Sequence, residues 1–283
     1  MTAEDGQFQD KFIAFVDVLG FSELVTRAEC GAGADVNTIL KLIDGLRWER
    51  EILGFREYGP TVCPESEMLS CDAGLRVLQV SDSVIVSSEV SPSGVISIVH
   101  FCHGLVIRAL KASALCRGYI TRGSVYHEGD IVFGSGYERA WKKEGMSTFL
   151  ADGNVQKGTP FVEIDPAICR YVGDVSDRCV KDMFGRLTET DGNSTAIYPF
   201  HTFDRIAESG IGSHSGSMSE KRHIDEVDNM ISTFEQMILD QKKFANRRGL
   251  ALIEHFCQEF SKAHERMRRA KEMIDRLDLP YPG

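Results

Sequence analysis

The segment LRVLQVSDSVIVSS, residues 75–88, constrains the fold more strongly than any other part of the chain. It alternates in polarity and is rich in β-branched residues, and both properties are typical of β-strands. The triplet Ser81-Asp82-Ser83 divides it, so the pattern predicts two antiparallel strands joined by a tight turn. Further strands are predicted at 11–17, 117–126 and 131–133.

Helical patterns separate these strands and complete the predicted fold class. A first helix is predicted to start at Ser22, a good N-cap residue, and a second to cover 35–55. A third is predicted to run from Pro92 to about Ala114, and a fourth to end near Glu144. Residues 146–202 are predicted to form a β-rich tail with short strands such as 161–165 and 196–200. Hairpins combined with helical crossovers predict an α+β fold, with an antiparallel or mixed sheet flanked by helices.

The C-terminal part of the chain has a different pattern. Residues 1–205 are predicted to form one domain, and 206–219 a Gly/Ser linker. Residues 220–283 carry apolar residues at 3,4 spacing in two stretches, a heptad stripe typical of packed helices. We expect a helical hairpin that turns near 245–249 and packs on itself or on a partner chain.

Composition limits where the protein acts and what it binds. A net charge of −10 argues against a protein that coats nucleic acid or an anionic membrane. The first residues lack the basic-then-apolar order of a signal peptide, and the apolar stretch 94–115 is interrupted by four basic or histidine side chains. None of the eight cysteines form a CxxC pair, which indicates reduced thiols and a cytoplasmic protein.

Two aspartates stand out as candidate functional residues. An apolar run ends at Asp17, and a turn containing Gly20 leads directly into a helix. A carboxylate beside helix-terminal N–H groups is suited to bind a magnesium ion and the phosphates that this ion neutralises. Asp82 lies between two apolar strands, where turn formation favours aspartate but folding does not demand a charge. If the two strands are neighbours, Asp17 and Asp82 can together bind two divalent ions.

Three segments, FVDVLGFSELV, VSDSVIV and RGYITRGSVYHEGDIVFGSGYERAWKKE, resemble the signature segments of class III nucleotidyl cyclases. The resemblance covers about residues 11–145 and is greatest to the Pycsar-type bacterial cyclases, which make cyclic UMP or cyclic CMP. It implies a ferredoxin-like core and attack of a ribose 3′-hydroxyl on the α-phosphate, with pyrophosphate leaving. It also implies a homodimer with sites at the interface, and a product-sensing effector protein in antiphage defence.

The resemblance implies roles for individual residues. Asp17 and Asp82 would bind two Mg²⁺ or Mn²⁺ ions, and Val18 would lend a backbone carbonyl. Backbone N–H groups of Leu19, Gly20, Phe21 and Ser22 would wrap the triphosphate. In the family alignment, Glu138 takes the position of the transition-state asparagine and Lys142 that of the arginine. A glutamate beside a triphosphate is unfavourable, so a shift in the register of this helix also has to be considered. The candidate cations are then Arg139, Lys142, Lys143 and Arg122.

The positions that read the base depart from the purine cyclases. Leu78 replaces the adenine-reading lysine, and Ile131 replaces its partner aspartate. A site that selects a base needs hydrogen-bonding groups placed for that base, so these aliphatic residues argue against ATP. A pyrimidine read by other groups, such as Gln79 or Arg76, fits better, and we expect UTP ahead of CTP.

Three alternatives remain open from the sequence. The first is an adenylyl or guanylyl cyclase with atypical base readers. The second is a catalytically inactive cyclase fold used as a nucleotide sensor or dimer scaffold, which retention of both Asp17 and Asp82 disfavours. The third is a two-metal phosphodiesterase or nuclease, which would need further carboxylates or histidines near the pair.

Overall fold

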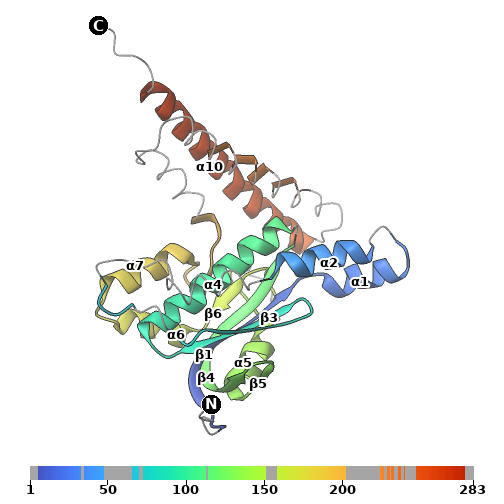
Figure 1. Cartoon of the computed structure of the whole chain (residues 1–283). Coiled ribbons are helices and arrows are strands. Elements are labelled where there is room, and N and C mark those ends of the chain that lie inside the picture. The colour runs from blue at the N-terminus through green and yellow to red at the C-terminus, as the bar shows by residue number, and fades with distance from the viewer. Residues whose placement is uncertain are drawn as a thin grey trace. The chain divides into compact units, whose positions relative to one another are not determined.

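The computed structural model describes most of the N-terminal part of the chain and one long helix near the C-terminus (Figure 1). The described residues are 6–32, 35–47, 66–69, 73–112, 114–150, 158–201, 224–225, 228–229, 231–232, 235–236, 239 and 247–277. The chain divides into two compact units, Met1–Tyr198 and Pro199–Gly283, and each is described by itself. The sequence had suggested a boundary at 205, and the predicted linker 206–219 lies outside the described residues.

A mixed sheet forms the centre of the first unit. Its strand order is β2-β3-β1-β4-β6-β8-β7, and β5 pairs with β4. The neighbours β2/β3, β3/β1 and β1/β4 are antiparallel, whereas β4/β6 is parallel. The strands are β1 (Gln9–Val18), β2 (Arg76–Val80), β3 (Ser83–Glu89), β4 (Cys116–Glu128), β5 (Ile131–Phe133), β6 (Val162–Ile164), β7 (Thr188–Thr190) and β8 (Thr195–Ile197). The predicted α+β class and the predicted hairpin are therefore confirmed.

The connections between the first four strands fix where their ends meet. Two helices link β1 to β2, and one long helix links β3 to β4. Because β3 lies between β1 and β2, and β1 lies between β3 and β4, the chain forms two interleaved β–α–β units. Strand β1 is antiparallel to β3, so the end of β1 lies beside the turn that begins β3. This topology brings the two candidate aspartates to one edge of the sheet.

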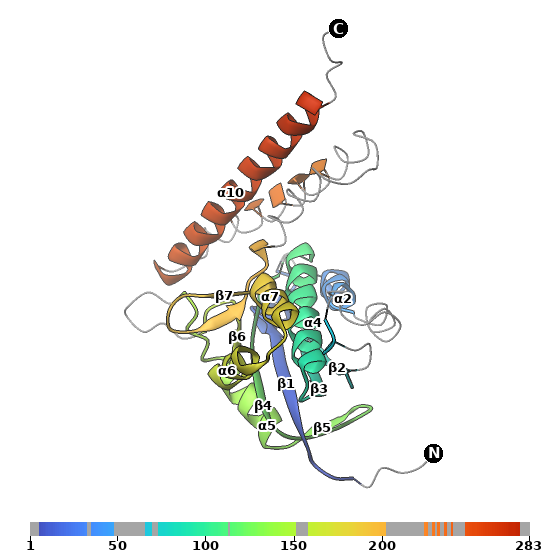
Figure 2. The ribbon, with the colours of Figure 1, turned by 90° about the vertical axis from the view of Figure 1, so that its left-hand side faces the viewer.

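Helices cover the two faces of the sheet unequally (Figures 1 and 2). One face packs against α4, with α2, α6 and α7 contributing to the same core cluster. The other face packs against α5, whose Ala140 joins a smaller cluster with Ile13 and Phe15 of β1. The helices are α1 (Phe21–Glu29), α2 (Val36–Gly45), α4 (Pro92–Lys111), α5 (Ser135–Glu144), α6 (Pro166–Asp174) and α7 (Arg178–Leu187).

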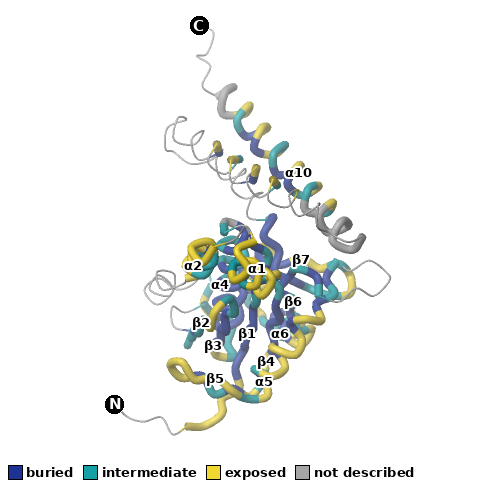
Figure 3. Tube along the Cα trace, turned by 90° about the vertical axis from the view of Figure 1, so that its right-hand side faces the viewer, coloured by how far each residue is buried: buried dark blue, intermediate teal, exposed yellow. Residues whose placement is uncertain are grey.

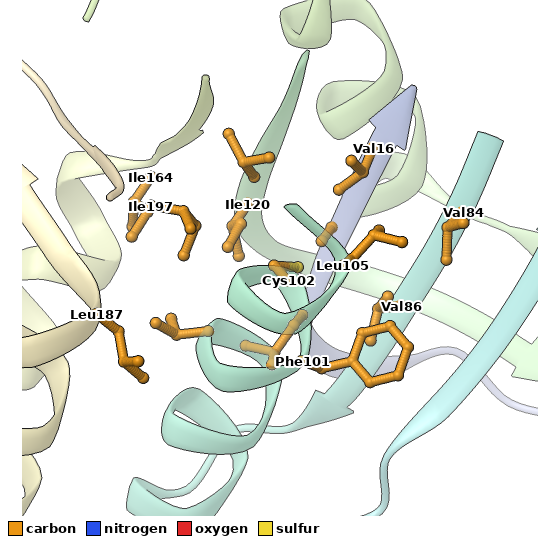
Figure 4. Packing of buried hydrophobic residues seen from close by; sticks show 14 of the residues in the cluster. Val16, Val84, Val86, Phe101, Cys102, Leu105, Ile120, Ile164, Leu187 and Ile197 are labelled. Atoms are coloured by element: carbon orange, nitrogen blue, oxygen red, sulfur yellow. The ribbon is translucent and has the colours of Figure 1, made fainter. Parts of the chain in front are cut away.

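Strand β1 is buried on both faces, which explains its unbroken apolar sequence. Phe12, Ala14 and Val16 face the larger core, whereas Ile13 and Phe15 face α5. Figure 4 shows Phe101, Cys102 and Leu105 of α4 packed beside Val16 and the β3 residues Val84 and Val86. Period-two alternation therefore places the next odd-numbered residue of β1, Asp17, on the α5 face.

Helix α4 is apolar because it is the central core helix. Its stretch Pro92–Leu110 is long and apolar enough to cross a membrane by length and composition, yet 72% of that window is buried. Ser91 caps the helix by accepting a hydrogen bond from Gly94 N–H, and Pro92 occupies the first turn, where no donor is lost. Such burial is typical of the core helix of a soluble domain.

Several predicted elements need correction. Helix α1 begins at Phe21 after Gly20, which adopts φ 78°, and no side chain caps it, so Ser22 is not the N-cap. Helix α2 begins at Val36 and ends at Gly45, and residues 48–55 of the predicted helix lie outside the described residues. Residues 166–187 form two helices instead of the predicted β-rich tail, because Asp165 and Asp177 each cap a helix start.

The thiol prediction is wrong at one position. Cys179, near the start of α7, is disulfide-bonded. The free cysteines in the described part of the chain are Cys30, Cys102, Cys116, Cys169 and Cys257.

The second unit contains an antiparallel helix pair. Helix α10 spans Arg247–Leu277, and helical residues between 224 and 239 lie against it. Lys271 Nζ lies 2.5 Å from Asp225 Oδ1, and His264 Nδ1 lies 2.7 Å from Asp228 Oδ1. Helix α10 already includes 247–249, where we had expected the turn. The buried stripe of this pair consists of Ile224, Ile231, Phe260, Ala263, Met267 and Ala270.

Candidate functional site

The β2–β3 turn holds Asp82 at the edge of the sheet. Val80 pairs with Ser83, so the turn contains only Ser81 and Asp82. Ser81 has φ 58°, a left-handed conformation that is uncommon for a residue with a side chain. Strain of this kind recurs at functional sites, where the surrounding structure holds it in place. The tight turn therefore fixes Asp82 relative to the end of β3.

Asp17 lies next to this turn on the neighbouring strand. The last paired residues of β1 and β3 are Val16 and Val84, which places Asp17 beside Ser83. Ser83 Oγ donates a hydrogen bond of 2.7 Å to Asp17 Oδ1. The structure thus brings together two aspartates that are far apart in the sequence.

The electrostatics of the pair favour a bound cation. Burial raises the pKa of Asp82, and the nearby charge and side chain of Asp17 raise it further. Two half-buried carboxylates that repel each other are stabilised by any cation placed between them. Carboxylate oxygens are the hard ligands that Mg²⁺ and Mn²⁺ prefer. The donor set therefore fits a divalent ion of this class.

The pair alone does not complete a metal coordination shell. In the described part of the chain, no group of three or more His, Cys, Asp or Glu side chains is placed to hold a metal. Mg²⁺ is usually bound through one or two carboxylates, with waters and substrate phosphates as the remaining ligands. A valine side chain has no ligand atom, so Val18 can offer only its backbone carbonyl. These features suit a site that is completed by a phosphate-bearing substrate.

The turn after β1 leads to a helix N-terminus. Leu24 N–H donates to Gly20 carbonyl at 3.0 Å, which closes the first turn of α1. The N–H groups of Phe21, Ser22 and Glu23 precede that bond and have no acceptor within the helix. Leu19 N–H donates to Leu115 carbonyl at 2.9 Å, so it holds the loop against β4 and is not free to bind phosphate.

The candidate base-reading residues lie in different places. Leu78 faces the α5 side and packs against the cluster that contains Phe15. Gln79 faces the opposite side, where its amide donates to Ile43 carbonyl of α2 at 3.3 Å. Ile131 lies on the β4–β5 hairpin and is 54% exposed. Only Leu78 of these three therefore shares the sheet face of Asp17, while Arg76 on that face pairs with Glu128 at 2.8 Å.

The candidate cations do not bond either aspartate in the described structure. Lys142 pairs with Glu138 on the exposed side of α5 at 2.8 Å. Arg139 donates to Arg122 carbonyl at 3.2 Å, and Lys143 lies 5.8 Å from the centre of the Tyr119 ring. Arg122 pairs with Asp10 at 2.7 Å, and its place opposite Phe12 puts it on the far face from Asp17. Figure 3 shows the outward side of α5 as exposed.

Two further groups at this edge were not identified from the sequence. Ser83 was seen only as part of a turn, although its position directly after Asp82 was a usable signal. Arg117 lies opposite Asp17 on β4, and its guanidinium forms an ion pair with Glu144 of α5. This ion pair fixes the C-terminal end of α5 beside the site.

No protein-family model and no curated protein matches the chain.

Proposed function

We propose that the chain is a metal-dependent nucleotidyl cyclase that converts a pyrimidine nucleoside triphosphate to its 3′,5′-cyclic monophosphate and pyrophosphate. One observation carries the proposal: Asp17 and Asp82 meet at one edge of the sheet, beside the N-terminus of α1. The strand order of β1 to β4, with every neighbour antiparallel, also agrees with the ferredoxin-like core that the sequence resemblance implies.

Different residues of the chain would bind the metal ions and the phosphates. Asp17 and Asp82 would hold Mg²⁺ or Mn²⁺, and the N–H groups that begin α1 would bind phosphate oxygens. The divalent ions, when bound, neutralise phosphate charge and lower the pKa of a coordinated hydroxyl. In the overall reaction the 3′-oxygen bonds to the α-phosphorus, the bond to the β-phosphate oxygen breaks, and the hydroxyl proton leaves to solvent.

The proposed substrate is UTP, with CTP next. Leu78 lies on the sheet face of Asp17 and offers no hydrogen bond to a base. A purine cyclase needs polar groups at this position, so the aliphatic side chain supports a pyrimidine. Arg76, on the same face of β2, is the nearest polar candidate along that strand.

A homodimer with sites at the interface is part of the proposal. Val80, on β2, pairs with Ser83 of β3 and is 56% exposed. Trp141, on α5, is 54% exposed. Exposed apolar side chains beside a charged site are typical of a surface that a partner covers. A second copy of α5 would bring Arg139 or Lys142 to the phosphates, where positive charge stabilises the developing negative charge.

We place this activity in the cytoplasm, as the source of a second messenger for an effector protein in antiphage defence. The burial of α4 agrees with a soluble enzyme. The disulfide at Cys179 counts against a cytoplasmic location, because cytosolic reductants keep most thiols reduced.

The decisive experiment is a product assay on the purified full chain. ATP, GTP, CTP and UTP are each incubated with Mg²⁺ or Mn²⁺, and cyclic nucleotides are resolved by mass spectrometry. We expect cyclic UMP above cyclic CMP, and a loss of at least about 100-fold in turnover for Asp17→Asn. Asp10→Asn on the same strand should retain activity, because Asp10 pairs with Arg122 on the other face.

The outcomes separate the competing functions. Dominant cyclic AMP or cyclic GMP would reject the pyrimidine assignment and keep the cyclase. Nucleotide binding without any product would favour a nucleotide sensor. Absence of both binding and turnover would refute the proposal.

A further inference from the structure

Ser83 directly follows the β2–β3 turn and makes a contact that the turn does not require. Serines in turns usually bond to their own or adjacent backbone groups, which stabilises the turn locally. Ser83 Oγ instead donates across to the next strand, to Asp17 Oδ1 at 2.7 Å. The residues that it joins are 66 positions apart in the sequence. This hydrogen bond therefore acts on Asp17 and not on the turn.

The geometry restricts the Asp17 side chain. Ser83 is the first residue of β3 and pairs with Val80, so the backbone that carries its hydroxyl is fixed by the sheet. A hydrogen bond from a neutral donor to a carboxylate is charge-assisted and directional. The hydrogen bond from Ser83 is accepted by Oδ1 of Asp17, and Oδ2 is the second oxygen through which this carboxylate could bind a cation. A carboxylate held in this way loses little conformational freedom when it binds a ligand.

The hydrogen bond between Ser83 and Asp17 lies beside a second carboxylate, that of Asp82. Asp82, directly before Ser83, interacts with the Asp17 side chain. Two like charges would turn away from each other if their side chains were free to rotate. The Ser83 hydrogen bond opposes that rotation, since it holds Asp17 at the Asp82 turn.

We propose that Ser83 is a positioning residue that holds Asp17 for the divalent cation Asp17 shares with Asp82. This inference rests on the proposed metal-dependent function. Groups that hydrogen-bond a metal-binding carboxylate orient it, and their removal typically lowers metal affinity or activity by 10- to 100-fold. Ser83 does not touch the substrate in this role, and acts only through Asp17.

The test measures Mn²⁺ binding directly. The full chain is titrated with Mn²⁺ alone, and free Mn²⁺ is followed by electron paramagnetic resonance. We expect Ser83→Ala to weaken binding about tenfold. Ser83→Thr keeps the hydroxyl and should stay within about threefold of the unaltered chain. The Mn²⁺ concentration that gives half-maximal turnover with UTP should shift in parallel.

The control is a second serine on the same face of the same strand. Ser87 Oγ bonds to His127 Nδ1 at 2.7 Å and has no contact with Asp17. Ser87→Ala therefore removes the same hydroxyl from β3 and should leave Mn²⁺ affinity unchanged. Circular dichroism and thermal unfolding of each variant establish that the folded state is present.

Failure of this inference is distinguishable from failure of the proposed function. If the unaltered chain binds Mn²⁺, Asp17→Asn abolishes binding and Ser83→Ala does not change it, the role of Ser83 is wrong and the metal site stands. If Asp17→Asn leaves Mn²⁺ binding unchanged, or the unaltered chain binds none, the metal site itself is refuted and the role of Ser83 with it. Loss of affinity in Ser87→Ala equal to that in Ser83→Ala would show a general effect on β3 and overturn the assignment.

Discussion

The ion pair between Arg117 and Glu144 should contribute measurably to stability, and Glu144→Gln tests it. Glu144 is the last residue of α5, where a negative charge is unfavourable for the helix dipole. Its side chain is only 11% exposed and that of Arg117 only 25%. Glu144 is therefore placed for Arg117 and not for the stability of its own helix.

The magnitude follows from this burial. Breaking a fully buried ion pair by removing one partner costs about 3–5 kcal/mol, because the remaining charge is left unpaired. Arg117 retains some access to water, so we reduce the expected cost to about 2 kcal/mol. For a unit of this size that corresponds to a fall of about 4–8 °C in Tm. Calorimetry or urea unfolding of the full chain measures it.

A second substitution on α5 supplies the control. Glu138 pairs with Lys142, but both side chains are more than 60% exposed. Glu138→Gln should therefore lower stability clearly less than Glu144→Gln, because it removes only a weak surface ion pair and a favourable dipole position. Equal losses for the two variants, or no loss for Glu144→Gln, would refute the argument from burial.

Two predictions concern the β2–β3 turn. Asp82→Asn should raise Tm at pH 7 without divalent ions, because the raised pKa of Asp82 means that its charged form is destabilising in the folded state. This advantage should shrink as the pH falls through the raised pKa of Asp82, where the unaltered carboxylate becomes protonated. A pH-independent difference would contradict the assignment. Ser81→Gly should stabilise the chain by about 0.5–1 kcal/mol in urea unfolding, since glycine adopts φ 58° without the cost that serine bears. A loss of stability would show that the Ser81 side chain has a contact worth more than that cost.

The hairpin and both aspartates were predictable because their signals are local. β-branched alternation over 75–88 predicted the turn at Ser81-Asp82-Ser83. The observed turn contains Ser81 and Asp82, and Ser83 already begins β3. An apolar run that ends in an aspartate located the end of β1 within one residue. Alternation along β2 also separates Leu78 from Gln79, so their opposite faces could have been predicted from the strand alone.

The missed features depend on short patterns or on distant contacts. Helices α6 and α7 are only 9 and 10 residues long, so their apolar repeats were too brief to outweigh the expectation of strands. Their capping aspartates and Pro166 were the available signals. The contacts of Asp17 with Ser83 and of Arg117 with Glu144 depend on strand register and helix docking, which no local pattern specifies.

The interleaved order of the sheet has a consequence for how the chain folds. Strand β1 is synthesised before both of its partners in the sheet, which come much later in the sequence. Such non-local pairing slows folding, because the intervening chain loses the entropy of closing a long loop before the stabilising contacts form. Asp17 and Asp82 therefore meet only once β3 has docked on β1. A ligand that needs both carboxylates binds only the folded chain and stabilises it by mass action. The free energy of unfolding therefore rises with the concentration of that ligand in the cell.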